Sequence, residues 1–247
     1  VVEGRTAVQW WLIAHERGHA DAAFNLGVAA DKLGPDAIVQ GRTATQWWLI
    51  AHERGDAKAT HNLGVAADKL GPDATVEGRT ATQWWLIAHQ HGGAGAALNL
   101  GTNANKLGPD AIVEKRTATQ WWAIAHEHGD AEAAFNLGIA AYELGPDAIV
   151  EKRTATGWWA LAAERGHASA AFNLGQTADK LGPDSVVEGR TATQWWALAA
   201  EFENATAASK LAEIADALGP DSAVEGRTAL EWRRRLAGES GPSTTGS

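Results

Sequence analysis

One pentapeptide carries the residue types of a zinc protease. His15-Glu16-Arg17-Gly18-His19 matches H-E-x-x-H, a motif in which two histidines one helical turn apart bind zinc and the glutamate acts as a general base. That chemistry requires an unbroken helix through both histidines. A glycine stands at the position of Gly18 in five of the six full copies of a repeat that runs through the chain, and glycine commonly follows the last turn of a helix. We therefore expect His19 at the start of the next helix, and we predict neither a metal site nor a catalytic site here.

Histidines also recur at one position of the repeat, as His15, His52, His89 and His126. Packed helices lie about 8–10 Å apart, whereas zinc takes its nitrogen ligands at about 2.0–2.1 Å. The four imidazoles therefore cannot converge on one ion. A histidine at a helix end can instead complement the negative pole of the helix dipole, and the sequence predicts no cofactor.

The thirteen tryptophans form six adjacent pairs plus Trp232. Exposed indoles could stack on sugars or bases, so carbohydrate binding is one hypothesis. Both members of each pair, however, lie on one apolar helical stripe with small alanines, and large rings against small residues pack densely. We predict that the pairs pack between helices. An arginine that recurs in all seven copies, Arg42 in the second, is predicted to tie each linker to its neighbour.

An asparagine ladder is the strongest candidate for binding a partner. It consists of Asn25, Asn62, Asn99, Asn136 and Asn173, with Lys210 in the sixth copy. An amide offers both a donor and an acceptor, so it suits the backbone of a peptide of any sequence. Hydrogen bonds between neighbouring helices are the alternative, and the sequence favours neither.

The residues around this asparagine vary between copies, whereas the packing positions hardly change. The position before it holds Phe24, His61, Leu98, Phe135, Phe172 and Ser209. The positions three and six residues after it also vary. At spacings of i, i+1, i+4 and i+7 these side chains share one helical face. The apolar group of Phe135, Ile139 and Tyr142 favours a binding surface over a merely solvated one.

A repeat of 37 residues positions all of these side chains. Six full copies start at Val1, Ile38, Thr75, Ile112, Ile149 and Val186, and a partial seventh starts at Ala223. No insertion or deletion interrupts the full copies, so each copy is one structural unit stacked on its neighbours. We predict a single α-solenoid over residues 1–237, made of six full repeats and a C-terminal capping helix.

Two helices fit in each copy. In the second copy, Thr43 and Gln46 form a capping box, and the helix that follows, which we name the Trp helix, runs to about Arg54. Asp56 caps a second helix, the Asn helix, which runs to about Leu70. The linker to the next Trp helix is either extended or contains one short turn, and nothing else in the copy reads as a strand.

The two ends of the chain differ. The sixth Asn helix is degraded in sequence, and Arg233, Arg234 and Arg235 give the last Trp helix the polar surface that caps a solenoid. The tail 238–247 has no apolar content and is predicted to be disordered. The first copy keeps the interior pattern and has no initiator methionine, so we expect either further repeats before Val1 or a second chain over this end. Self-association would then involve Trp10, Trp11, Leu12 and Ile13.

The string GDAEAAFNLGIAAYELG and the following A-x-x-WW-x-x-A, within residues 129–166, resemble Sel-one-like repeats, which are related to tetratricopeptide repeats. Asn136-Leu137-Gly138 resembles the N-L-G of the first helix in that family, and Ala155, Trp158, Trp159 and Ala162 resemble its second helix. The Gly-Pro-Asp linker is longer than the common pattern. The resemblance implies a right-handed superhelix of antiparallel helix pairs that acts as an adaptor for proteins or peptides.

Composition narrows the classes of partner. Lys plus Arg is 21 against 30 for Asp plus Glu, a formal net charge of −9, which disfavours a nucleic-acid backbone and an anionic membrane surface. There is no cysteine, so disulfides and cysteine metal sites are excluded.

The leading hypothesis is a non-catalytic scaffold that binds a protein or peptide in a concave groove lined by the Asn helices. Self-association through the N-terminal end is the alternative, and carbohydrate binding is a weaker one.

Overall fold

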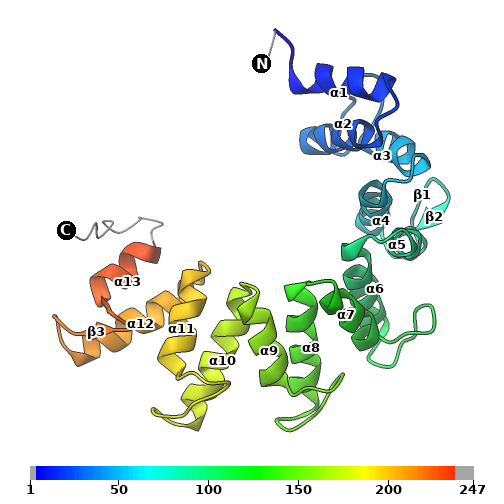
Figure 1. Cartoon of the computed structure of the whole chain (residues 1–247). Coiled ribbons are helices and arrows are strands. Elements are labelled where there is room, and N and C mark those ends of the chain that lie inside the picture. Colours follow the sequence, from blue (N-terminus) through cyan, green and yellow to red (C-terminus); the bar gives the residue numbers. More distant parts are fainter. Residues whose placement is uncertain (1–3, 237–247) are drawn as a thin grey trace. The chain divides into compact units, whose positions relative to one another are not determined.

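The computed structural model describes residues 4–236 of the chain, and it is an all-α solenoid (Figure 1). The Trp helices are α1 (Ala7–Glu16), α3 (Ala44–Glu53), α5 (Ala81–Gln90), α7 (Ala118–Glu127), α9 (Ala155–Glu164), α11 (Ala192–Glu201) and α13 (Ala229–Leu236). The Asn helices are α2 (Ala20–Leu33), α4 (Ala57–Leu70), α6 (Ala94–Leu107), α8 (Ala131–Leu144), α10 (Ala168–Leu181) and α12 (Ala205–Leu218). The predicted fold class and helix alternation are confirmed.

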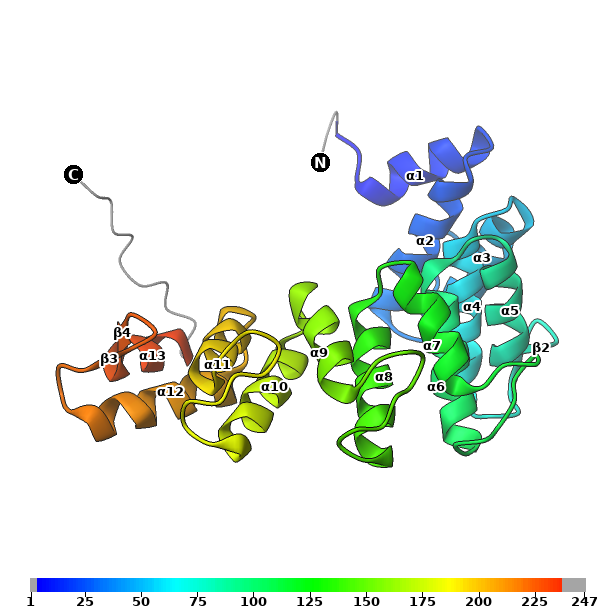
Figure 2. The ribbon, with the colours of Figure 1, turned by 60° about the horizontal axis from the view of Figure 1, so that its bottom comes forward.

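The chain divides into two compact units, Val1–His128 and Gly129–Ser247. The described part of the first unit contains α1 to α7, and that of the second contains α8 to α13. Within each unit every helix packs against the next one in sequence, as two views show (Figures 1 and 2). The predicted continuity of one solenoid over residues 1–237 stays a prediction, and the tail 238–247 lies outside the described residues.

Each Trp helix begins at the predicted threonine cap. In α3 the Gln46 backbone N–H donates to Thr43 Oγ1 at 3.4 Å, and the Thr43 N–H donates to Gln46 Oε1 at 3.0 Å. The same capping box opens α1, α5, α7 and α11. In α9, Gly157 replaces the glutamine, and only the threonine half of the box remains. Two otherwise unpaired amides are satisfied at each full box, which is why these short helices start at a fixed residue.

The Asn helices begin at a second set of caps. Asp56 accepts a hydrogen bond from the Ala59 N–H at 2.8 Å, as predicted, and Asp130 and Asn204 act in the same way. Every Asn helix ends at a glycine with positive φ, such as Gly71 at 128°. The sixth Asn helix, α12, has the same length as the others, because its apolar stripe and cap survive the changes in sequence.

The linkers contain short hairpins, which settles the question that the sequence left open. Strand β1 (Thr75–Val76) pairs antiparallel with β2 (Arg79–Thr80), and β3 (Ala223–Val224) pairs with β4 (Arg227–Thr228). The other full linkers make single bridges between the corresponding valine and arginine. The two residues between each pair of partners, Glu77 and Gly78 in the third copy, have φ of 50° and 74°, the left-handed conformation of type I′ turns.

The first tryptophan of each pair fastens the hairpin to the Trp helix. In repeats two to seven its Nε1–H donates to the carbonyl of the hairpin valine at 2.7–3.0 Å. The recurring arginine lies over the same indole, 4.7–5.6 Å from its centroid, in all seven copies. The arginine therefore ties the linker to the Trp helix of its own repeat through a cation–π contact.

The second tryptophan packs against the glycine of the N-L-G string in the preceding Asn helix. A Cβ on Gly27, Gly64, Gly101, Gly138 or Gly175 would lie 2.3–2.5 Å from the indole Cδ1 of the following repeat. The leucine before this glycine is fully buried. The tryptophans of repeats two to six are at most 5% exposed, so their predicted role in packing is confirmed.

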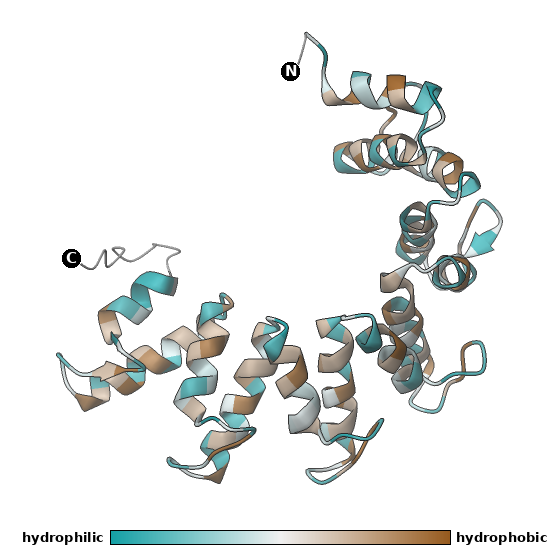
Figure 3. Cartoon of the chain, in the orientation of Figure 1, coloured by the Kyte–Doolittle hydropathy of each residue, from teal (hydrophilic) through white to brown (hydrophobic). Residues whose placement is uncertain are grey.

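The C-terminal end departs from this pattern at the two positions that form the glycine–tryptophan contact in the earlier repeats. Ala212 stands where the earlier Asn helices have glycine, and Arg233 stands where the earlier Trp helices have their second tryptophan. The glycine and the indole that meet in the earlier repeats are therefore both absent here. Arg233 instead pairs with Asp216, and Arg235 pairs with Glu201 at 2.6 Å. Figure 3 shows α13 as largely hydrophilic, and its role as a capping helix stays a prediction.

Candidate partner-binding face

Within each unit, side chains of successive Asn helices meet and form what we name the Asn-helix face. It comprises the ladder asparagine, the residue before it, and the residues three and six positions after it. In the N-terminal unit, Lys69 Nζ of α4 lies 3.9 Å from Asp31 Oδ1 of α2, and Lys106 Nζ of α6 lies 3.6 Å from Asp68 Oδ1 of α4. These exposed pairs add little stability, but they show that α2, α4 and α6 adjoin.

The ladder asparagines are half-buried on this face. Within residues 4–236, the side-chain amides of Asn25, Asn62, Asn136 and Asn173 have no hydrogen-bond partner; Asn99 Nδ2 lies 3.5 Å from His61 Nε2. Hydrogen bonds between neighbouring helices were the alternative interpretation of the ladder. Among the described residues only Asn99 makes a contact of that kind. An amide without an internal partner keeps its donor and acceptor for water or for a ligand.

The N-terminal unit has a groove of about 690 Å³ across the first turns of α2, α4 and α6. Phe24, His61 and Asn62, which the sequence singled out, line it together, and Asn25 and Leu98 lie on the same face outside its lining. The sequence reasoning missed Gly93 and Gly95, which replace the larger side chains of other copies and leave the groove open. The GGAGA string of the third copy, in which glycines replace polar residues of the other copies, could have pointed to these two positions.

In the C-terminal unit the predicted aromatic residues are covered to different extents. The Phe135 ring stacks on the His167 imidazole with centroids 4.2 Å apart. Tyr142 is 52% exposed and lies 5.5 Å from the Trp159 ring. Ile139, Phe172 and Asn173 are half-buried on the same face. Phe135, Ile139 and Tyr142 lie on one helix, as predicted, although Phe135 is already partly occupied by an internal ring.

The recurring histidines are packing groups. His15, His52 and His89 meet the first tryptophan of the next repeat edge-on, with centroids 5.0–5.2 Å apart. Burial first, and then the charge of a nearby arginine, lower the pKa of all three. The three histidines lie in the last turn of their helices, as the dipole interpretation requires, and the contact with indole is a further interaction that the sequence did not predict. In the described part of the chain, no group of three or more His, Asp or Glu side chains could hold a metal.

Self-association and carbohydrate binding would use surfaces other than the Asn-helix face. No residue of α1 is buried, and Trp10, Trp11, Leu12 and Ile13 are half-buried; self-association through them stays a prediction. The burial of the indoles in repeats two to six removes the open row of rings that sugar stacking would use. Among the helices of residues 4–236, none is long and apolar enough to cross a membrane.

Fold and face together define an α-helical repeat protein of the solenoid class. No protein-family model and no curated protein sequence matches the chain. Among solved structures it is similar to a Sel1 repeat protein from Oxalobacter formigenes, with a TM-score of 0.60 and 23% identity over 92% of this chain and 87% of that one. It is also similar to the immunity protein PA5088 from Pseudomonas aeruginosa, with a TM-score of 0.53 and 20% identity over 90% and 81% of the two chains. These likenesses confirm the resemblance to Sel-one-like repeats at the level of the fold.

Proposed function

We propose that this chain is a non-catalytic scaffold that binds a protein partner by holding an extended peptide segment on the Asn-helix face. The observation that carries the proposal is the row of half-buried asparagines, four of which have no hydrogen-bond partner for their side-chain amide within residues 4–236, while Asn99 has a single long contact to His61. A half-buried amide without a partner loses part of its hydration and gains no hydrogen bond in return. A ligand that forms hydrogen bonds with it offsets this free-energy cost. A peptide backbone supplies both a donor and an acceptor at every residue except proline.

The spacing of the helices suits such a ligand. Successive Asn helices meet through the ends of long side chains, so their spacing is about 10 Å, the upper end of the range for packed helices. An extended peptide rises about 3.3 Å per residue. Each repeat would therefore meet about three peptide residues, and a peptide of about ten residues would span the three Asn helices of the N-terminal unit. The backbone contacts would supply affinity, and the variable side chains beside each asparagine would supply specificity.

The experiment starts from a displayed library of random peptides of about ten residues, selected against the native chain. Fluorescence anisotropy then compares the selected peptides on the wild type and on a variant with Asn62→Ala and Asn99→Ala. Two hydrogen bonds contribute about 2 kcal/mol, so we expect about 30-fold weaker binding with an unchanged helical circular dichroism spectrum.

The matched control is Gln90→Ala. Gln90 is an exposed amide at the end of α5, in a pocket formed by that helix and the linker hairpins rather than on the Asn-helix face. Its replacement should leave peptide affinity unchanged. Equal affinity of the double asparagine variant and the wild type would refute the proposed site.

A further inference from the structure

An aromatic side chain of the C-terminal unit shows how one position on the Asn-helix face can be filled. His167, the N-cap of α10, stacks on Phe135 with centroids 4.2 Å apart and an angle of 19° between the rings. Its Nε2 lies 3.0 Å from Glu132 Oε2, and its Nδ1 accepts the Ala170 N–H at 3.1 Å. One planar ring thus covers an aromatic face, meets a carboxylate and caps a helix.

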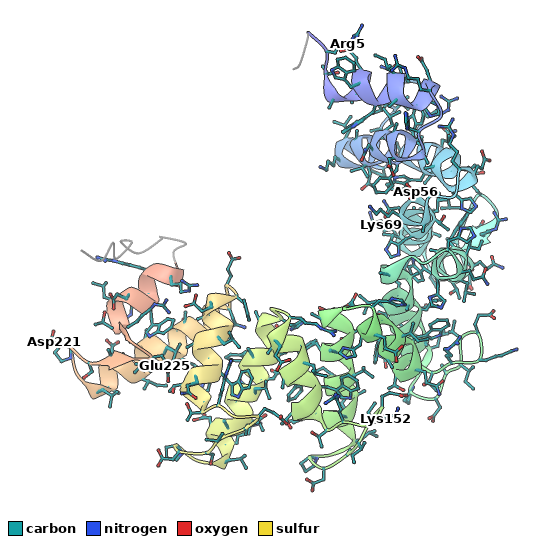
Figure 4. All side chains as sticks on the ribbon, viewed as in Figure 1. Arg5, Asp56, Lys69, Lys152, Asp221 and Glu225 are labelled. Carbon is teal, nitrogen blue, oxygen red and sulfur yellow. The ribbon has the colours of Figure 1, made fainter. Side chains whose placement is uncertain are left out.

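The same three positions occur three repeats earlier, in the N-terminal unit, without the ring. Asp21 corresponds to Glu132, Phe24 to Phe135, and Asp56 to His167. Asp56 keeps the capping function through the Ala59 N–H, but a carboxylate does not cover the Phe24 ring. Phe24, Asp21 and Asp56 instead line the groove of about 690 Å³. Figure 4 places Asp56 between the ribbons of α2 and α4.

The third repeat enlarges this opening. Gly93 stands at the position of His167, and Gly95 stands at the position of Glu132. A Cβ on Gly95 would lie 3.3 Å from His61 Cε1, so any larger residue there would crowd the imidazole. The small residue at Gly95 therefore leaves space beside His61, and the groove extends across the first turns of three helices. The volume is within the range of about 300–1,000 Å³ that is usual for ligand pockets.

We propose that this groove binds a planar cationic side chain, specifically an arginine of the bound peptide, stacked on Phe24 and paired with Asp21 and Asp56. The internal counterpart supplies the template, since a planar nitrogen-bearing ring already occupies the equivalent place on Phe135 beside Glu132. A guanidinium combines stacking with several donors in one plane, which an ammonium does not.

Charge complementarity supports the same occupant. The groove is lined by two carboxylates, of Asp21 and Asp56, against one ammonium, of the exposed Lys58. His61 adds no positive charge at neutral pH, because burial lowers its pKa. A neutral aromatic side chain would offer no donor to either carboxylate, whereas a guanidinium would offer several. The inference rests on the proposed function, because it names the side chain that one part of the Asn-helix face recognises.

The test uses N-acetyl-arginine amide as the probe, with the lysine and citrulline amides as matched controls. The chain has only four phenylalanines, so isotope-labelled phenylalanine gives ring signals that NMR can assign by substitution. We expect the arginine amide to shift the Phe24 signal saturably, and the lysine and citrulline amides to bind at least about tenfold more weakly, because each lacks either the plane or the charge.

Two reciprocal variants use residues that already occupy this position elsewhere in the chain. Asp56→His should fill the groove with an internal ring and weaken arginine binding at least about tenfold. His167→Asp should open the equivalent site, so that the arginine amide newly shifts the Phe135 signal. Both variants should keep the wild-type circular dichroism spectrum, because aspartate and histidine each cap an Asn helix here.

A Phe24 signal that responds equally to all three amides, or that still responds in the Asp56→His variant, would overturn the inference. The outcome is separable from that of the proposed function. Library peptides that depend on Asn62 and Asn99 without moving the Phe24 signal would overturn only the arginine site. A selective Phe24 response together with peptide binding that ignores the asparagines would overturn only the asparagine ladder.

Discussion

Replacing Gly64 by alanine should destabilise the chain, although the same change stabilises most helices. Gly64 is buried in the middle of α4, and an added Cβ would lie 2.4 Å from Trp85 Nε1 and 2.5 Å from Cδ1. Real Cβ atoms do not approach other atoms so closely, so the indole or the helix must move. Trp85 is only 3% exposed, and the packed surroundings leave its ring little room to swing.

Two contributions of opposite sign determine how Gly64→Ala changes the free energy of unfolding. In an exposed helix interior, glycine to alanine is favourable by about 1 kcal/mol. Overpacking of a filled core costs about 1–3 kcal/mol. Since the contact at Gly64 is far inside van der Waals distance, we expect an overpacking cost of about 2–3 kcal/mol, and the free energy of unfolding should fall by about 1–2 kcal/mol.

The assay is urea unfolding followed by circular dichroism and tryptophan fluorescence, with both probes compared because repeat arrays can unfold in steps. The same substitution in a Trp85→Leu background should become neutral or stabilising, as the natural Ala212 opposite Arg233 indicates. A higher urea midpoint for Gly64→Ala in the wild-type background would show that the helices do not pack at the distance described.

Two further predictions concern the tryptophan pairs and the histidines beside them. Trp84→Phe should lower the free energy of unfolding by about 1 kcal/mol more than Trp85→Phe does. The reason is that Trp84 donates a hydrogen bond to the Val76 carbonyl at 2.8 Å, whereas Trp85 Nε1 has no partner within the described residues. Equal losses in urea unfolding would contradict this prediction. The pKa of His89 is lowered from 6.5 by burial, so the unfolded chain binds more protons as the pH falls and stability falls with it. His89→Ala should therefore flatten the decline of the urea midpoint between about pH 7 and pH 5, and an unchanged slope would count against a buried neutral imidazole.

Local signals in the sequence predicted the helices well. The T-x-x-Q boxes, the aspartate caps and the terminal glycines each act within four residues, so their consequences can be inferred without knowing the tertiary structure. Thr43, Gln46 and Asp56 make the expected hydrogen bonds. The burial of the tryptophans also followed from their spacing with the small alanines of the same stripe.

Contacts between repeats were harder to predict, because they depend on how one helix pair is placed on the next. The clash that keeps Gly64 a glycine arises from Trp85 in the following repeat, and the ring that covers Phe135 comes from His167, 32 residues away. The sequence showed the substitution of tryptophan by Arg233, but not that the glycine replaced at Ala212 is the contact of that tryptophan in the other repeats. The linker hairpins were missed because their strands are only two residues long.

Photo-cross-linking tests the central claim most directly, because it reports which face of the chain a bound peptide touches. Leu98 and Leu86 are both half-buried, but Leu98 lies on the Asn-helix face of α6, whereas Leu86 lies on α5 beside the linker hairpins. Each is replaced in turn by p-benzoylphenylalanine, and a labelled peptide selected from the library is added before irradiation. We predict covalent capture from position 98 and none from position 86. Capture from position 86 alone would contradict the assignment of partner binding to the Asn helices.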